Sequence, residues 1–354
     1  MLLKQFDYNL PKNLIAQKPI NPRDHSRLLI LRKATGKIEH KHFYDIADYL
    51  DKGDVLVLNN TKVMAARLIG KRAETGGRVE IFLLKKLTHL DPPFKREAGE
   101  VWECLVGGQK RKENLQVEFT GGLKAEILKN NLDGTWSVKF NRTGAAFMKL
   151  VKKIGLVPLP PYIKRGQEMK SDRNNYQTVY ADEAKLGSVA APTAGFHFTK
   201  ALINKLKKKG VQFEYVTLQV GLGTFAPVKV DDITKHKMHS EWVEVDKKTL
   251  NNIVKAKSEN RRIIAVGTTS LRTLESVFRK MPIKNYSFWT NIFIYPGYKF
   301  KIIDAMITNF HLPKSTLVML VSALAGREKI FKAYGAAVKK KYRFFSYGDA
   351  MLII

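Results

Sequence analysis

The chain has 354 residues, enough to bury a sizeable core and, by its length, to form about two domains. A single cysteine, Cys104, excludes an intramolecular disulfide framework and a cysteine-rich zinc site, and the longest apolar run, over residues 317–326, is about half as long as a membrane span requires. We therefore expect a soluble, cytoplasmic protein. The 62 Lys and Arg residues against 32 Asp and Glu give a net charge of +30, which favours a polyanionic partner such as nucleic acid. The alternative is a lysine-rich surface that serves only for solvation.

The first half of the chain reads as a strand followed by a separate, strand-rich segment. Residues 54–60 (DVLVLNN) form a short apolar run bounded by turn residues, which predicts a buried strand. Short alternating segments follow up to residue 140 and predict a small antiparallel barrel or sandwich: RVEIFLLKK, VWECLV, LQVEFT, LKAEIL and WSVKF. A helix is expected over residues 145–154, before a proline-rich stretch, LVPLPPYIKR, that excludes regular structure.

Strands and helices alternate after residue 189. Thr199 is expected to cap an amphipathic helix, TKALINKLKKKG, and a strand, VQFEYVTLQV, follows it. Further along the chain we expect strand RRIIAVG, helix SLRTLESVFRK, strand FKIIDAMIT and helix STLVMLVSALAG. This alternation predicts an α/β fold, in which residues 1–60 and 151–354 form a discontinuous, layered α/β catalytic domain. Residues 61–150 are then an inserted small antiparallel β-barrel domain.

Three short loops hold four of the eight histidines and are the first candidates for a reaction centre: APTAGFHF (191–198), HKMHSEW (236–242) and TNFHLP (308–313). His239 or Glu241 could transfer a proton, because a carboxylate beside an imidazole fixes its tautomer and raises its basicity. His236 and His239 lack the third ligand and the spacing that a metal site requires, so we expect no metal. His197 and His311 could face a cleft, or could be structural histidines packed between aromatic side chains.

Two glycine-containing loops could bind a ligand. In AVGTTSLRTLES (265–276) a strand ends at Gly267, and Thr268 and Thr269 then open a helix whose free N–H groups could bind an anion. Arg272 could pair with a carboxylate, although a plain helix cap would explain the same residues. GLGTFA (221–226) matches a dinucleotide-binding glycine pattern, but Pro227 stands where the phosphate-binding helix should begin. Its glycines more simply permit a tight turn or close approach to a ligand.

These stretches together resemble the S-adenosylmethionine:tRNA ribosyltransferase-isomerase family of queuosine biosynthesis. The resemblance runs in order along the whole chain. Its matching stretches are LIAQKPINPRDHSRLLIL, GDVLVLNNTKVMAARL, VPLPPYIKR, YQTVYA, APTAGFHFT, VTLQVGLGTFAPV, HKMHSEW, AVGTTSLRTLES, TNIFIYPGY, DAMITNFHLPKSTLVMLVSALAGRE and YRFFSYGDAML. The chain departs from the family pattern at Asn60, where aspartate is common, and at GGQKRK, where RPGKR is common.

The resemblance implies a particular reaction. S-adenosylmethionine serves as ribosyl donor, and the acceptor is 7-aminomethyl-7-deazaguanine (preQ1) at the wobble position of tRNA with a GUN anticodon. The products are epoxyqueuosine-tRNA, adenine and methionine. The reaction begins with removal of a C5′ proton made acidic by the sulfonium, and it needs no metal or further cofactor. The alternatives are an S-adenosylmethionine-dependent RNA methyltransferase, whose glycine-rich loop we do not find, and a non-catalytic RNA-binding protein.

On this resemblance we assign roles to individual residues and expect a monomer that contacts no membrane. The catalytic acid and base candidates are His197, His239 and Glu241. Phe196, Trp242 and Phe225 could face the sulfonium. The substrate-binding candidates are Thr193, Gly195, Phe196, Gly221, Gly223, Thr224, Trp242, Thr268, Thr269, Arg272 and His311. The RNA-binding candidates are Arg23, Arg27, Lys62, Lys164 and Arg165.

Overall fold

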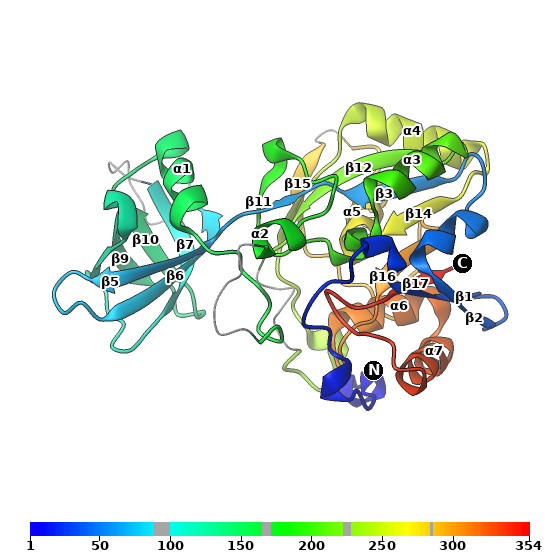
Figure 1. The fold of residues 1–354 in the computed structure, drawn as a ribbon, viewed down its shortest axis with the longest axis horizontal. Coiled ribbons are helices and arrows are strands. Elements are labelled where there is room, and N and C mark those ends of the chain that lie inside the picture. Colours follow the sequence, from blue (N-terminus) through cyan, green and yellow to red (C-terminus); the bar gives the residue numbers. More distant parts are fainter. Residues whose placement is uncertain (88–99, 165–170, 222–227, 284–285) are drawn as a thin grey trace. The chain divides into compact units, whose positions relative to one another are not determined.

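The computed structural model describes residues 1–87, 100–164, 171–221, 228–283 and 286–354 (Figure 1). Contacts between Cα atoms divide the chain into two compact units. The first, which we call the α/β unit, comprises Met1–Lys62, Pro160–Arg165 and Asn174–Ile354. The second, the barrel unit, comprises Val63–Leu159 and Gly166–Arg173.

The α/β unit is built on one mixed sheet. Its strands are β1 (Arg27–Leu31), β2 (Ile38–His42), β3 (Val55–Asn59), β12 (Gln212–Gln219), β13 (Glu241–Glu244), β14 (Ile263–Val266), β15 (Ser287–Thr290), β16 (Ala305–Asn309) and β17 (Ala350–Ile353). Nine strands lie in the order β15-β13-β12-β3-β14-β16-β17-β1-β2. The four central strands β12, β3, β14 and β16 are mutually parallel, so their carboxyl ends meet at one edge of the sheet.

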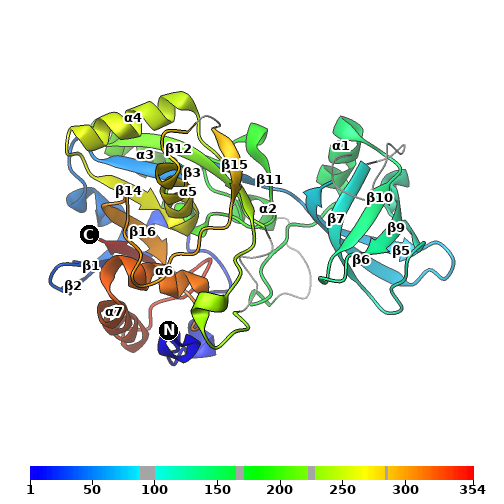
Figure 2. The ribbon, with the colours of Figure 1, turned by 180° about the vertical axis from the view of Figure 1, so that it is seen from behind.

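Helices cover both faces of this sheet, as Figures 1 and 2 show from opposite sides. They are α3 (Lys200–Lys208), α4 (Lys247–Ser258), α5 (Gly267–Arg279), α6 (Thr316–Ala325) and α7 (Arg327–Lys339), with short 3-10 helices such as η4 (Phe43–Tyr49) and η7 (Thr193–His197). Alternate strand residues point to opposite faces. In β3, Val55 and Val57 pack in the core with α4 to α7, whereas Leu56 and Leu58 pack with α3 and η4.

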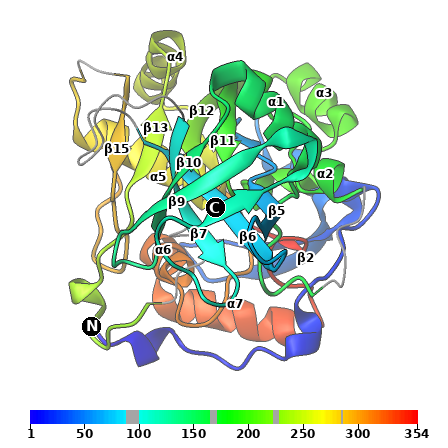
Figure 3. The same cartoon turned by 90° about the vertical axis from the view of Figure 1, so that its left-hand side faces the viewer.

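The barrel unit is a closed antiparallel barrel in the order β10-β7-β6-β5-β8-β9 (Figure 3). Its elements are β5 (Arg67–Arg72), β6 (Arg78–Lys86), β7 (Glu100–Gly107), β8 (Gln116–Glu118), β9 (Lys124–Asn130), β10 (Trp136–Phe140) and α1 (Gly144–Ile154). Buried and less buried residues alternate along β6 and β7, as expected for strands with one face toward a barrel interior. Phe147 of α1 packs on Phe140, with ring centroids 4.8 Å apart. Outside the nine-stranded sheet and the barrel lie three further short elements, namely β4 (Lys62–Val63), β11 (Leu186–Ser188) and α2 (Asp172–Asn175).

The predicted α/β fold with a small antiparallel barrel is confirmed. The Thr199 cap is also present, because its hydroxyl accepts a hydrogen bond from the Leu202 N–H at 3.1 Å. One expected strand, FKIIDAMIT, is wrong in its first half, since β16 begins only at Ala305. The backbone N–H groups of Lys301, Ile302 and Ile303 instead donate to the buried carboxylate of Glu275. No helix in the described part of the chain is long and apolar enough to cross a membrane.

Candidate active site

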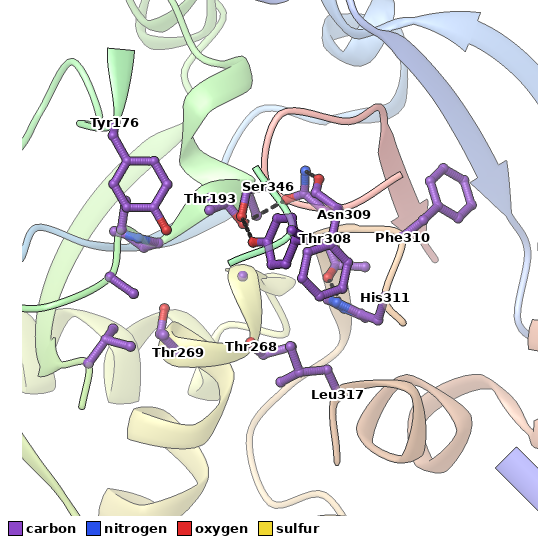
Figure 4. A pocket seen from close by; sticks show the side chains of 18 residues that line it. Tyr176, Thr193, Thr268, Thr269, Thr308, Asn309, Phe310, His311, Leu317 and Ser346 are labelled. Carbon is purple, nitrogen blue, oxygen red and sulfur yellow. Dashed lines mark hydrogen bonds between the residues drawn. The ribbon is translucent and has the colours of Figure 1, made fainter. Parts of the chain in front are cut away.

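A pocket in the α/β unit lies at the carboxyl ends of the parallel strands (Figure 4). Val220 follows β12, Gly267 follows β14, and Thr308 and Asn309 end β16. This edge is where open α/β sheets bind ligands. The lining residues are Tyr162, Tyr176, Ala190, Ala191, Pro192, Thr193, Ala194, Val220, Gly267, Thr268, Thr269, Thr308, Asn309, Phe310, His311, Leu317, Phe345 and Ser346. The enclosed part measures about 70 Å³, below the roughly 300–1,000 Å³ of typical small-molecule sites, so a nucleoside-sized ligand would extend beyond it.

The start of helix α5 forms one wall of this pocket. Gly267 takes a φ of +89°, a backbone conformation that glycine adopts without strain. No side chain in the described part of the chain caps the first turn of the helix, and Thr268 and Thr269 line the pocket there. The hydroxyl of Thr269 is buried without a hydrogen-bond partner in the described residues. The helix therefore presents polar groups to the pocket that its own structure leaves unused.

Arg272 lies one turn further along α5 and is buried, with 6% of its surface exposed. Its Nη1 donates to the carboxylate of Glu241, which is 3% exposed on β13. The other two guanidinium nitrogens, Nε and Nη2, are buried and make no hydrogen bond to any residue that the structure describes. These two nitrogens form the edge of a guanidinium that binds a carboxylate through two parallel hydrogen bonds. Arg272 thus has one edge without a partner among the described residues, although its side chain does not line the pocket.

His197 on η7 is buried, and both of its ring nitrogens are hydrogen-bonded. Nδ1 lies 2.7 Å from the Ser26 hydroxyl and Nε2 lies 3.2 Å from Nδ2 of Asn309. The same Asn309 nitrogen donates to the carbonyl of Phe345 at 3.1 Å, which fixes the orientation of the amide. Nε2 of His197 must therefore accept and Nδ1–H must donate. Burial, with Arg343 and Arg23 nearby, lowers the pKa of His197 to about 3, so the ring is neutral.

His311 lines the pocket directly, in the loop after β16. Its Nε2 lies 2.9 Å from the Thr308 hydroxyl. Its main chain is held from both sides, because its N–H donates to the hydroxyl of Tyr334 at 3.1 Å and its carbonyl accepts from Tyr8. Burial lowers the pKa of His311 to about 3 as well, so this ring is also neutral at physiological pH.

Comparisons with known proteins show the family to which this chain belongs. The profile of the queuosine biosynthesis protein family matches residues 3–353. The chain belongs to this family. A relative from Acetivibrio thermocellus named S-adenosylmethionine:tRNA ribosyltransferase-isomerase is 51% identical over 356 aligned residues, covering 100% of both chains. A crystal structure of S-adenosylmethionine tRNA ribosyltransferase from Thermotoga maritima is 39% identical, covers 99% of this chain and 100% of its own, and has a TM-score of 0.55. The family resemblance expected from the sequence is confirmed.

Of the residues expected to bind substrate, four line the pocket of this family member: Thr193, Thr268, Thr269 and His311. Gly195 lies against Tyr180 instead, since a Cβ at Gly195 would be 1.9 Å from the tyrosine hydroxyl. Phe196 packs between Tyr176 and Tyr347 in the core.

The remaining substrate candidates lie elsewhere. Trp242 stacks edge-on against Trp289 at 5.5 Å. The Gly221 N–H lies 3.4 Å from the Glu241 carboxylate. Gly223, Thr224 and Phe225 lie outside the described residues.

The three catalytic candidates do not line the pocket at the carboxyl ends of the parallel strands. His197 lines a smaller neighbouring pocket with Ser26 and Phe196. His239 is exposed in the loop before β13, and Glu241 faces Arg272. Within the described residues, no group of three or more His, Cys, Asp or Glu side chains could hold a metal ion.

Some of the RNA-binding candidates use their side chains in hydrogen bonds or ion pairs within the protein. Arg23 donates to the carbonyls of Gln177 and Asn174, and Arg27 pairs with the buried Asp349. Lys62 pairs with Glu183, whereas the side chain of Lys164 is exposed. Arg165 lies outside the described residues.

Sequence reasoning missed several pocket residues, above all Tyr162, Tyr176, Asn309 and Ser346. Each lies in a stretch that carries the family resemblance: VPLPPYIKR, YQTVYA, TNFHLP and YRFFSYGDAML. The signal was therefore present, but it could not separate side chains that face the pocket from those that support it. Asn60, a departure from the family pattern, accepts a hydrogen bond from Thr217 at 2.8 Å, and an aspartate could accept the same bond.

Proposed function

We propose that this chain is an enzyme that transfers and isomerises the ribosyl group of S-adenosylmethionine onto 7-aminomethyl-7-deazaguanine at the wobble position of tRNA. The products are epoxyqueuosine-tRNA, adenine and methionine. Family membership over residues 3–353 and the name of the 51% identical relative support the reaction class. The pocket at the carboxyl edge of the sheet supports a site for a small donor molecule.

The observation that carries the donor assignment is the free edge of Arg272. A buried guanidinium with two unsatisfied nitrogens is costly unless a ligand completes it. The methionine part of S-adenosylmethionine ends in a carboxylate and an ammonium group. The carboxylate would take the Nε and Nη2 edge of Arg272, and the Glu241 carboxylate beside it would accept from the ammonium. A buried pair of opposite charges is thus complementary to both charges of an amino acid.

The rest of the donor would extend from this clamp into the pocket. Residues three or four apart on a helix share a face, so Thr268 and Thr269 lie on the same side of α5 as Arg272. Their hydroxyls suit the polar groups of a ribose. The aromatic rings of Tyr162, Tyr176, Phe310 and Phe345 line the pocket and would face the sulfonium, a cation that aromatic rings attract by about 0.5–2 kcal/mol. In this proposal they replace Phe196 and Trp242 in that role.

The acceptor would be a tRNA with a GUN anticodon, bound by the basic surface of the chain. The +30 charge supports a contact with phosphates, and a wobble base in a loop can leave its stack to enter a pocket. We propose that the enzyme acts as a monomer. A tRNA substrate also supports a cytoplasmic location.

The chemical steps need an acid, a base and little else from the protein. Removal of a C5′ proton leaves an electron pair beside the sulfonium, adenine departs as the ribose ring opens, and the aminomethyl nitrogen attacks. Closure of the epoxide then expels methionine. S-adenosylmethionine is a substrate here, and the sequence of steps calls for no separate cofactor. His197, His239 and Glu241 stay candidates for acid and base roles; Asn309 would connect His197 to the pocket.

Product analysis tests this function. The enzyme is mixed with S-adenosylmethionine and tRNA bearing the modified base, and the small products are separated. Adenine and methionine in equal amounts are expected. S-adenosylhomocysteine would instead identify an RNA methyltransferase, and tRNA binding with no turnover of the donor would identify a non-catalytic RNA-binding protein.

A further inference from the structure

His311 combines a position in the pocket wall with a ring nitrogen that no residue described in the structure binds. It lines the main pocket, as Figure 4 shows, whereas His197, His236 and His239 do not. Its Nε2 is engaged by the Thr308 hydroxyl at 2.9 Å. Its Nδ1 has no hydrogen-bond partner within the described ranges. We propose that His311 is the general base that removes the C5′ proton of the donor; this inference rests on the proposed function.

The tautomer needed for this role is compatible with the contacts. The Thr308 hydroxyl can accept a hydrogen bond from Nε2–H, and the lone pair of the neutral ring then resides on Nδ1. A second shell of this kind sets which nitrogen is the base, as a carboxylate or carbonyl does for other catalytic histidines. His197 offers no equivalent nitrogen, because Asn309 occupies its Nε2 and Ser26 its Nδ1.

The ring is also held in place before any ligand binds. Tyr334 and Tyr8 fix the main chain of His311 on either side, and both tyrosines pack within one aromatic group, with ring centroids 5.3 Å apart. A catalytic group positioned by packing loses little freedom when the substrate arrives. Burial lowers the pKa of His311 to about 3, so the ring is neutral at physiological pH; the same shift makes it a weaker base than a free imidazole, and its role therefore depends on its position against the donor.

The step balances in atoms and charge. The C5′–H bond breaks, its electron pair stays on C5′ beside the sulfonium, and the proton forms a bond to Nδ1 of His311. The net positive charge moves from the sulfonium, which becomes a neutral ylide, to His311, which becomes an imidazolium. When adenine departs, the imidazolium can give that proton to an adenine nitrogen, which restores the neutral ring for the next turnover.

The test uses His311→Gln and His311→Ala in the full-length enzyme with S-adenosylmethionine and substrate tRNA. Glutamine can keep a hydrogen bond to Thr308 but cannot act as a base. We expect both variants to bind the donor within a few-fold of wild type, and to lose about 10²–10⁴-fold in turnover and in exchange of C5′ hydrogens with deuterated solvent. Added imidazole should restore part of the exchange in His311→Ala. His42→Ala, an exposed histidine stacked on Tyr44, is the matched control and should react normally.

The outcomes separate this inference from the function on which it rests. Normal exchange of C5′ hydrogens in His311→Gln would overturn the assignment of the base. The assignment would also fail if the variants lost turnover only in proportion to their loss of donor affinity and if imidazole did not restore exchange in His311→Ala. A wild-type enzyme that releases no adenine would instead overturn the proposed function, and the role of His311 with it.

Discussion

Arg272 and Glu241 form a buried ion pair through one guanidinium nitrogen, and the other two have no hydrogen-bond partner among the residues that the structure describes. A pair made solely for stability would be expected to satisfy the remaining donors, because unsatisfied buried polar groups cost about 1–3 kcal/mol each. The two side chains come from α5 and β13, which lie 31 residues apart in sequence. The fold thus buries an arginine with two unpartnered nitrogens in the same helix as Thr268 and Thr269, which line the pocket.

Replacing Arg272 by lysine should separate charge from geometry. A lysine ammonium can still pair with Glu241, but it lacks the two-nitrogen edge that would hold a carboxylate. We expect Arg272→Lys to weaken S-adenosylmethionine binding by about 10–150-fold, the equivalent of about 1.5–3 kcal/mol for a charged hydrogen bond. Calorimetric titration measures this. Wild-type affinity in a folded Arg272→Lys variant would remove Arg272 from the donor site.

The two buried histidines should make stability depend on pH. The pKa of His197 and of His311 is lowered to about 3 in the folded state, below the ordinary value of 6.5. The unfolded chain therefore binds more protons between these limits. The stability from these neutral rings is complete above about pH 6.5 and falls as the pH drops toward 3, by about 1.4 kcal/mol per pH unit for each histidine.

Proton uptake on unfolding measures this contribution directly. Proton uptake is obtained by comparing the heat of unfolding in buffers of different ionisation enthalpy. At pH 5, the wild-type protein should take up about one proton more on thermal unfolding than His311→Gln does. Equal uptake by the two proteins would mean that His311 is already protonated in the fold.

Asn309 should control the protonation of His197. Its amide donates to Nε2, a bond that only the neutral imidazole can accept. In Asn309→Asp a carboxylate faces the ring, which favours the imidazolium, so the pKa of His197 should rise by roughly one to three pH units. Thr193→Val, which removes only a 3.3 Å contact to the Asn309 oxygen, is the matched control. An unchanged histidine titration by NMR in Asn309→Asp would contradict this link.

Binding of tRNA should weaken steeply with salt if the +30 charge contacts phosphates. Each phosphate neutralised by Lys or Arg releases condensed counterions, and six or more such contacts lose about 10³-fold or more in affinity between 50 and 200 mM salt. A plot of log affinity against log salt tests this. A nearly flat line would show that the lysine excess serves only to solvate the surface.

Local patterns predicted most elements of the fold. The strand of residues 54–60, the barrel strands and the Thr199 helix follow directly from apolar periodicity and capping residues. The prediction for residues 300–304 was wrong. Their apolar pattern is typical of a strand, but the backbone N–H groups of residues 301–303 donate to the carboxylate of Glu275, which lies 26 residues before Lys301. A partner so distant in sequence leaves no local signal.

The site was less predictable than the fold, for a similar reason. Thr268 and Thr269 could be placed at the pocket because a strand-to-helix junction dictates their position. His197 and His311 look alike in sequence, each between a phenylalanine and an apolar or aromatic residue. Their hydrogen-bond partners distinguish them, Ser26 and Asn309 for His197 and Thr308 for His311, and these contacts depend on how the chain folds in space.

The most direct test of the account follows two labels through one reaction. The donor is S-adenosylmethionine with ¹³C in its ribose and deuterium in its methyl group. It is mixed with the enzyme and with tRNA bearing 7-aminomethyl-7-deazaguanine. The masses of the wobble nucleoside and of free methionine are then measured by mass spectrometry. If the enzyme transfers the ribosyl group, the ribose label enters the nucleoside while the methyl label remains on methionine. Deuterium in the nucleoside without the ribose label would contradict it.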